Sequence, residues 1–156
     1  MNTGTTKRIV DYADIKIESD EYKDLSLKEM LIVQYRLYED CLCFMGFKIT
    51  NFTDLSQHHC FIKECDKGPK TMENLAPLML IAHRFLNLIE GTDKSMYENI
   101  NSIMKEMIIQ KSKPTIRQYT EIDKQLSLFE LCYEEQVTPN QLKLIKSSYQ
   151  YRPFYR

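Results

Sequence analysis

The sequence predicts an all-α protein: a single compact bundle of about five helices, with a short irregular or hairpin insertion between the first and second helices. Two observations predict this fold class. Apolar residues recur at spacings of three and four over most of the chain, the periodicity of amphipathic helices. The 156 residues include only four glycines and five prolines, whereas β-sandwiches, propellers and nucleotide-binding folds need glycine at turns and phosphate loops. We expect an N-terminal arm over residues 1–25, the bundle over 26–150 and an aromatic, basic C-terminal tail over 151–156.

The first helix is predicted to begin after Ser26, because Ser26 and Glu29 match a capping box, in which each side chain accepts a hydrogen bond from the backbone amide of the other residue. Apolar residues continue at helical spacing to Met45, and Gly46 suits the left-handed position that follows a helix. The apolar face is so wide that we expect this helix to be central in the bundle.

Residues 47–70 leave two alternatives open. The apolar residues of 47–52 and 60–62 could form a short hairpin, or the segment could hold one short helix capped by Thr53 or Asp54. Turn-forming residues predict a loop over 66–70 in either case.

The second helix is predicted to run from Thr71 or Asn74 to Glu90 and to end at Gly91. Pro77 is tolerated only near the first turn of such a helix, because proline lacks the amide hydrogen and clashes with the preceding turn.

Three more helices complete the predicted bundle. The third is capped by Thr92 and carries apolar residues over 96–108. Pro114 separates it from the fourth, whose apolar face extends over 116–133. The fifth opens at Thr138, where a capping residue is followed by proline in the first helical position.

Charge and cysteine content disfavour several classes of protein. Lys and Arg number 21 and Asp and Glu 22, a net charge of -1, whereas nucleic-acid-binding domains usually carry a basic excess. The chain has five cysteines and no apolar N-terminal run typical of a signal peptide, so we expect an intracellular protein, cytoplasmic or nuclear, with reduced thiols. The longest mostly apolar stretch, over 75–89, is too short and too often interrupted by polar residues to cross a membrane.

One segment has the residue types of a metal site. Zinc prefers cysteine and histidine ligands, and a zinc module would draw on His58, His59, Cys60 and Cys65. Their spacing differs from the paired cysteines of a structural zinc knuckle, and we expect Cys41, Cys60 and Cys132 to act as small core residues instead. We therefore predict no metal and no cofactor.

The sequence contains no motif of a catalytic site. It lacks a phosphate-binding glycine loop, a G-x-S-x-G nucleophile turn and an H-E-x-x-H metal motif. Nothing near the three histidines indicates a paired nucleophile. We therefore predict that the protein is not an enzyme.

The aromatic tail and the wide first helix direct the functional prediction. Large aromatic and arginine side chains dominate binding at protein interfaces, and surplus apolar surface marks a groove or a self-association surface. We predict a protein-interaction module (an adaptor, inhibitor or complex subunit) that binds a protein partner through an apolar helix groove or an aromatic patch. The surplus apolar surface could instead form a homodimer interface. The predicted contact residues are Tyr35, Tyr38, Tyr151, Arg152, Phe154, Tyr155 and Arg156.

Two alternatives from other classes stay open. A nucleic-acid-associated factor would use the tail together with Lys143 and Lys146, since aromatic and arginine side chains can stack on single-stranded bases. A small zinc-binding module would use residues 58–65. Residues with AT-rich codons outnumber those with GC-rich codons, which indicates a viral or other AT-rich genome and says nothing about mechanism.

Overall fold

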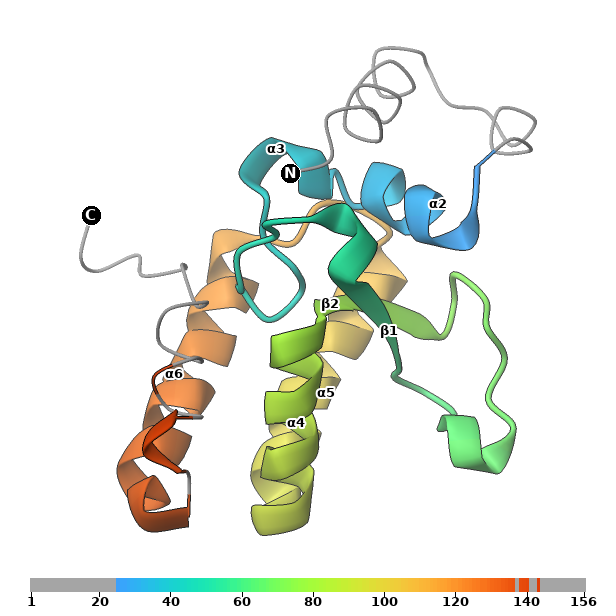
Figure 1. Ribbon diagram of the computed structural model, residues 1–156. Helices are drawn as coiled ribbons and strands as arrows, with labels where there is room; N and C mark the ends of the chain where they lie inside the picture. Colours follow the sequence, from blue (N-terminus) through green and yellow to red (C-terminus); the bar gives the residue numbers. More distant parts are fainter. Residues whose placement is uncertain (1–24, 137, 141–142, 144–156) are drawn as a thin grey trace.

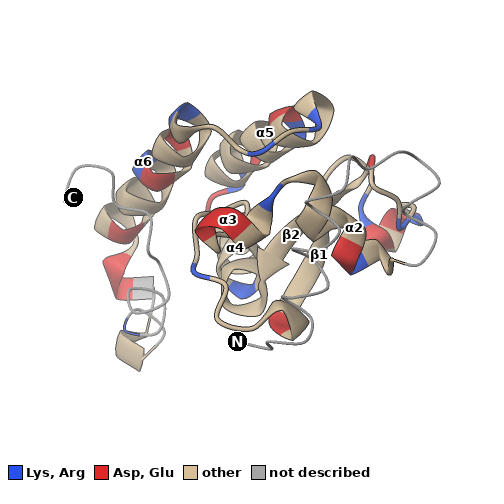
Figure 2. Cartoon of the chain, turned by 90° about the horizontal axis from the view of Figure 1, so that it is seen from above, with Lys and Arg blue, Asp and Glu red and all other residues tan. Residues whose placement is uncertain are grey.

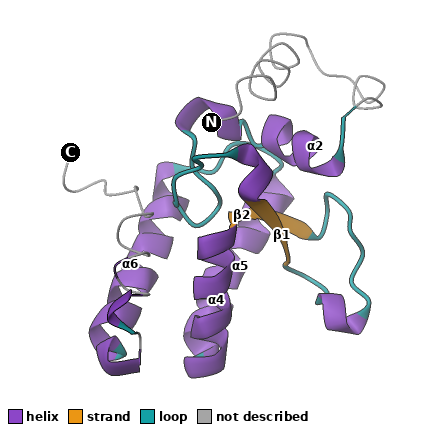
Figure 3. Ribbon diagram, viewed as in Figure 1, coloured by secondary structure: helices purple, strands orange, loops and turns teal. Residues whose placement is uncertain are grey.

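The computed structural model describes residues 25–136, 138–140 and 143, and it contradicts the all-α prediction. A two-stranded antiparallel sheet accompanies the helices, so the fold is mixed α and β. In Figure 1 the long helices α4, α5 and α6 extend to the lower edge of the molecule, α2 and α3 lie at its upper end, and the strands lie beside the upper parts of the long helices, as Figure 3 also shows. The elements are α2 (Leu27–Gln34), α3 (Leu37–Asp40), β1 (Leu55–His59), β2 (Leu75–Met79), α4 (Leu80–Thr92), α5 (Lys94–Gln110) and α6 (Ile116–Cys132).

The sheet pairs β1 with β2, from Leu55 opposite Met79 to His59 opposite Leu75. Strand β2 occupies the segment for which the sequence predicts the start of the second helix. All five of its residues are buried, and a short continuous apolar run fits a buried strand as well as a buried helix. Pro77 is compatible with the strand, because β2 pairs with one strand only and proline is tolerated in edge strands.

Residues 47–70 contain a strand, but not the hairpin or the helix that the sequence predicts. The strand is β1, and its partner is β2 rather than a neighbouring segment. A short 3₁₀ helix, Phe52–Asp54, precedes it. Its cap is Asn51, whose side chain accepts a hydrogen bond from the amide of Thr53 at 3.0 Å, so neither Thr53 nor Asp54 has this role.

The predicted first helix is replaced by two short helices, α2 and α3, and residues 42–45, which the sequence predicts as its continuation, are not helical. The capping box is confirmed, since the Ser26 hydroxyl accepts from the Glu29 amide at 3.1 Å and the Glu29 carboxylate accepts from the Ser26 amide at 3.2 Å. Arg36 is left-handed (φ 54°) and interrupts the helix, and Cys41 (φ 53°) ends α3. Because the segment is broken into short pieces, its many apolar residues can reach the core from several directions, which one straight helix with so wide an apolar face would not allow.

The three long helices match three predicted segments, with changed ends. Helix α4 begins only at Leu80. Asp93, not Thr92, caps α5: its carboxylate accepts from the Met96 amide at 3.1 Å, while the Thr92 hydroxyl donates to the Leu88 carbonyl at 2.8 Å. Helix α4 packs against α5, and α5 packs against α6.

The core lies where the sheet meets the long helices. Phe85 of α4 makes edge-to-face contacts with Phe129 of α6 and with Phe47, at centroid distances of 5.5 and 6.4 Å. Basic and acidic residues are interspersed along α5 and α6 (Figure 2). Within the described residues, no helix is both long and apolar enough to cross a membrane. The N-terminal arm except Leu25, most of the predicted fifth helix and the tail over 151–156 lie outside the described residues.

Candidate functional site

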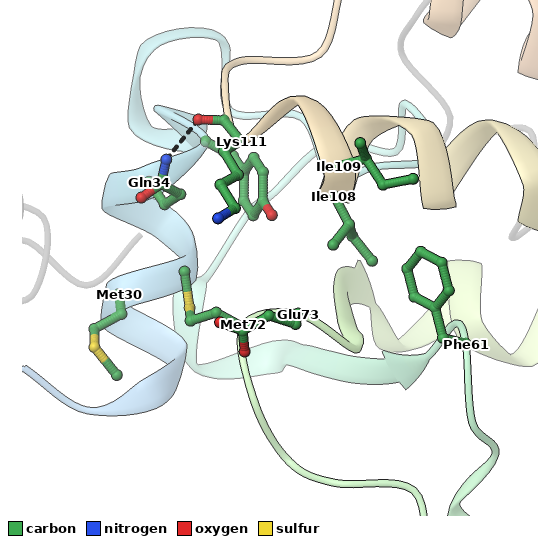
Figure 4. Close-up of a pocket in the computed structure, with 9 residues that line it drawn as sticks. Met30, Gln34, Phe61, Met72, Glu73, Ile108, Ile109 and Lys111 are labelled. Carbon is green, nitrogen blue, oxygen red and sulfur yellow. Dashed lines mark hydrogen bonds between the residues drawn. The ribbon is translucent and has the colours of Figure 1, made fainter.

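An apolar cavity of about 630 Å³ opens where α2, the loop between the strands and the end of α5 meet. We call it the apolar groove. Figure 4 shows its side chains arranged around a common space, with α2 on one side, the loop below and α5 above. Its volume is within the range of about 300–1,000 Å³ that ligand sites usually have. Its lining residues are Met30, Gln34, Tyr35, Phe61, Met72, Glu73, Ile108, Ile109 and Lys111.

The loop wall is held in position by the buried side chain of Asn74. Its Oδ1 accepts hydrogen bonds from the amides of Phe61 and Ile62, both at 2.9 Å. Its Nδ2 donates to the carbonyls of Ile62 at 2.9 Å and Pro69 at 3.0 Å. The side chain thereby uses both donors and both acceptor positions within the loop, so Phe61 and Met72 are attached to a well-supported backbone.

Two lining side chains are apolar and yet exposed. Phe61 is 43% exposed and Ile109 is 69% exposed, whereas Ile108 beside it is buried. Met30 and Met72 are half-buried, and their flexible thioethers can adjust to an incoming surface. Exposed apolar side chains next to a cavity are typical of a binding site.

Tyr35 and Tyr38 are the only predicted contact residues within the described part of the chain. Tyr35 is 1% exposed, packs edge-to-face on Phe44 with centroids 4.8 Å apart, and forms part of the groove wall. Burial raises the pKa of Tyr35 to about 12, and its hydroxyl makes no hydrogen bond with the described residues. Tyr38 is half-buried against the core and does not line the groove. The structure does not describe Tyr151, Arg152, Phe154, Tyr155 and Arg156.

Sequence reasoning missed most of the groove. Phe61 and Met72 lie in an irregular loop, which has no periodic signal. Ile109 does leave one: it is the last of three successive apolar residues, 107–109, near the end of a predicted helix. At about 100° per residue, three successive side chains span about 200° of the helix surface, which indicates that one of them lies toward solvent.

A second cavity, of about 400 Å³, shares Phe61 with the apolar groove and has a more polar lining. We call it the polar cavity. The Lys105 ammonium lies 5.4 Å from the centroid of the Phe61 ring, and the Lys63 ammonium lies 5.5 Å from that of Tyr97. Both aromatic rings are therefore covered by cations. The other lining residues are Cys60, Glu90, Lys94, Glu98 and Asn101.

The buried His58 and the half-buried His83 connect the sheet to α4 and α5. The rings of His58 and His83 are 5.5 Å apart, and His58 Nε2 lies 2.8 Å from Asn101 Oδ1. Burial lowers the pKa of His58 to about 4 and also lowers that of His83. The Nε2 atom of His59 is buried without a hydrogen-bond partner in the described structure. His58 and His83 are therefore neutral at pH 7 and contribute to packing.

Ser56 and His83 form a contact that resembles a nucleophile and its base. The Ser56 hydroxyl lies 2.9 Å from His83 Nδ1 and 3.0 Å from the carbonyl oxygen of Leu78. A serine hydroxyl has one proton and a carbonyl only accepts, so Ser56 donates to Leu78 and His83 donates to Ser56. His83 is then not placed to take the Ser56 proton. The contact joins α4 to the sheet.

The structure does not bring the predicted zinc ligands together. His58 and His59 are successive residues of β1 and point to opposite faces of the sheet. Cys60 is buried and Cys65 is exposed. Of the cysteines predicted as core residues, Cys60 is buried, whereas Cys41 is half-buried and the prediction is wrong for the exposed Cys132. Burial also raises the pKa of the Cys60 thiol, which disfavours the thiolate that zinc binds. Across the described ranges, no three His, Cys, Asp or Glu side chains are grouped to hold a metal ion.

No family model, curated protein or solved structure matches this chain. A functional proposal therefore depends on the geometry of the described residues.

Proposed function

We propose that this chain is a non-enzymatic protein-interaction module that binds a segment of a partner protein in the apolar groove. The observation that carries the proposal is a preformed cavity of about 630 Å³ with Phe61 and Ile109 exposed at its edge. Burial of apolar surface is the main driving force of protein association, and a few buried anchors usually supply most of the binding energy. An adaptor, an inhibitor or a complex subunit would all bind in this way.

The construction of the groove supports this proposal. Asn74 supports the loop wall with four hydrogen bonds, so less freedom is lost when a partner binds. Met30 and Met72 supply adaptable surface, which interfaces that accept varied side chains often use.

The two alternatives have less support. The net charge of -1 disfavours a nucleic-acid-associated factor, because such domains usually carry a basic excess. A zinc-binding module would have to bring together Cys60 and Cys65, one buried and the other exposed.

A displayed library of random peptides, selected on the immobilised full chain, tests the proposal. We expect the selected peptides to bind Ile109→Asp about tenfold or more weakly, as loss of a binding anchor does, and to bind Leu131→Asp like the parent. The two positions are matched, because both are aliphatic, helical and exposed, at 69% and 77%. Neither substitution should disturb folding much, which far-UV circular dichroism checks.

Two outcomes would contradict the proposal. One is a selection that yields no peptide, or only peptides that tolerate Ile109→Asp. The other is a homodimer in light scattering that Ile109→Asp dissociates, because the groove would then be a self-association surface.

A further inference from the structure

We propose that the partner segment is both acidic and apolar, with large apolar side chains that enter the apolar groove and flanking carboxylates that bind Lys105 and Lys111. This inference rests on the proposed function and specifies the chemistry of the partner. Three features of the described structure carry it: the charges along α5, the position of Phe61 between two cavities, and the hydroxyl of Tyr35.

Lys105 and Lys111 flank the apolar part of the α5 wall. Between them in the sequence are Ile108 and Ile109, and both isoleucines line the groove. Figure 4 shows the Lys111 side chain directed toward the space between α2 and the loop. Among the described residues, no carboxylate lies within 4.0 Å of either ammonium. Apolar surface flanked by cations without an ion pair is complementary to apolar residues flanked by carboxylates.

Lys105 is already positioned at the boundary between the two cavities. Its ammonium lies 5.4 Å from the centroid of Phe61, which lines both the apolar groove and the polar cavity. A cation held over a ring gives up less freedom when it binds a carboxylate. The polar cavity continues along the same side of α5 to Tyr97 and Lys94, so a longer segment would reach a further cation.

Acidic residues near the groove constrain how the segment lies. Glu73 is on the loop wall, across the groove from α5 (Figure 4), and Glu98 is in the polar cavity. A partner carboxylate would be repelled there and attracted on the α5 side. We therefore expect the acidic residues of the segment to face α5 and a neutral or basic residue to face Glu73.

The spacing of the two lysines gives the spacing of the carboxylates. Lys105 lies in α5 and Lys111 is the residue that directly follows its last residue, Gln110. Their backbones are six residues apart, about 9 Å along the helix axis at about 1.5 Å per residue. A helical partner would match this with acidic residues about two turns apart, and an extended partner with acidic residues two or four positions apart, because only alternate side chains of an extended segment share a face.

The Tyr35 hydroxyl adds a polar contact on the opposite side. Tyr35 lines the groove next to α2, and none of the hydrogen bonds of the described residues uses its hydroxyl. It can donate to a backbone carbonyl or to a carboxylate of the segment, which would orient the segment between α2 and α5.

The sequences of the selected peptides test this inference separately from the proposed function. Only peptides whose binding is lost on Ile109→Asp are counted. We expect Asp and Glu to be enriched on both sides of a large apolar pair relative to the unselected library. We also expect Lys105→Gln to weaken binding about two- to fivefold, as loss of a partly exposed ion pair does, and added salt to weaken it further.

Reversing the charge of both lysines tests the inference most directly. When the double variant Lys105→Glu/Lys111→Glu is the target of a second selection, the selected peptides should carry basic residues on both sides of the apolar pair. The control target is Lys124→Glu, whose position is on α6 and outside both cavities. Peptides selected on this control should keep the acidic preference. Two results would overturn this inference and leave the proposed function intact. In one, the peptides that lose binding on Ile109→Asp show no enrichment of acidic residues. In the other, the enrichment of acidic residues is also found with the double variant. A selection with no groove-dependent peptide would overturn both.

Discussion

His58 Nε2 lies 2.8 Å from Asn101 Oδ1, and this hydrogen bond joins the sheet to α5. Asn101 Nδ2 donates to the carbonyl oxygen of Cys60 at 3.0 Å, which identifies Oδ1 as the atom facing His58. An amide oxygen only accepts, so His58 carries a proton on Nε2. Asn101 therefore holds both the end of β1 and the beginning of the loop that carries Phe61.

We predict that Asn101→Asp raises the pKa of His58 from about 4 toward its ordinary value of 6.5. The carboxylate still accepts from His58 and adds a negative charge, which favours the imidazolium. NMR titration of the histidine ring protons measures this shift. His83, which forms its hydrogen bond with Ser56 instead, serves as the internal control and should shift less. An unchanged pKa at His58 would contradict the contact.

The free energy of unfolding should fall as the pH is lowered from about 6.5 to about 4. Because burial lowers the pKa of His58 from 6.5 to about 4, the unfolded chain binds a proton in this window that the folded chain does not. The shift corresponds to about 3 kcal/mol, at ~1.36 kcal/mol per pKa unit. Burial of His83 acts in the same direction.

Urea unfolding at several pH values measures this dependence. A His58→Gln variant should be less stable at pH 7 but less sensitive to pH over the same range, so the difference between the two curves isolates His58. Parallel curves for the two proteins would contradict the prediction.

Alanine should have opposite effects at Gly68 and Gly91. A Cβ atom at Gly68 would lie 1.9 Å from the carbonyl oxygen of Ile62, whereas one at Gly91 would meet nothing within 4 Å. Gly68→Ala must therefore displace the loop wall of the groove and should lower the melting temperature. Gly91→Ala, in the last turn of α4, should raise it slightly, since alanine is favoured over glycine in helices by up to about 1 kcal/mol. Thermal unfolding followed by circular dichroism compares them, and equal melting temperatures would be inconsistent with the loop packing.

Removal of the hydroxyl should lower the free energy of unfolding at Tyr133 and leave it nearly unchanged at Tyr35. The Tyr133 hydroxyl donates to Asp93 Oδ2 at 2.7 Å and thereby lowers the pKa of Asp93. Tyr133→Phe should destabilise the protein and raise that pKa. Tyr35→Phe should change the free energy of unfolding by less than about 0.5 kcal/mol, because no hydrogen bond with the described residues is lost. Chemical denaturation measures both, and a larger loss for Tyr35→Phe would indicate an internal partner for its hydroxyl.

Much of the helical part could be predicted because its signals are local. Ser26 and Glu29 mark the start of α2, and the apolar stripe from Ile116 marks α6. The sequence predicts a break at Gly91 and a cap at Thr92, whereas α4 continues through Gly91 to Thr92 and Asp93 provides the cap. Caps and stripes involve residues within one or two turns of each other, so a short stretch of sequence contains the information.

The groove could not be predicted in the same way. It brings together Met30 of α2, Phe61 of the loop and Ile109 of α5, which are far apart in the chain. The predicted contact residue Tyr35 does reach its wall, but as a buried residue rather than an exposed anchor. Whether an apolar residue is buried or exposed depends on how separate elements pack against each other, and a local sequence pattern contains no information about that packing.

By itself, the sequence determined where most of the long helices lie and which of their faces are apolar, because those properties depend on neighbours in the chain. The tertiary structure decided that residues 75–79 form a strand, because an apolar run of this length becomes a strand or a helix according to what pairs with it, and here β1 does. It also decided the left-handed break at Arg36 and the shape of the groove. Each of these depends on contacts between distant segments, which exist only once the chain has folded.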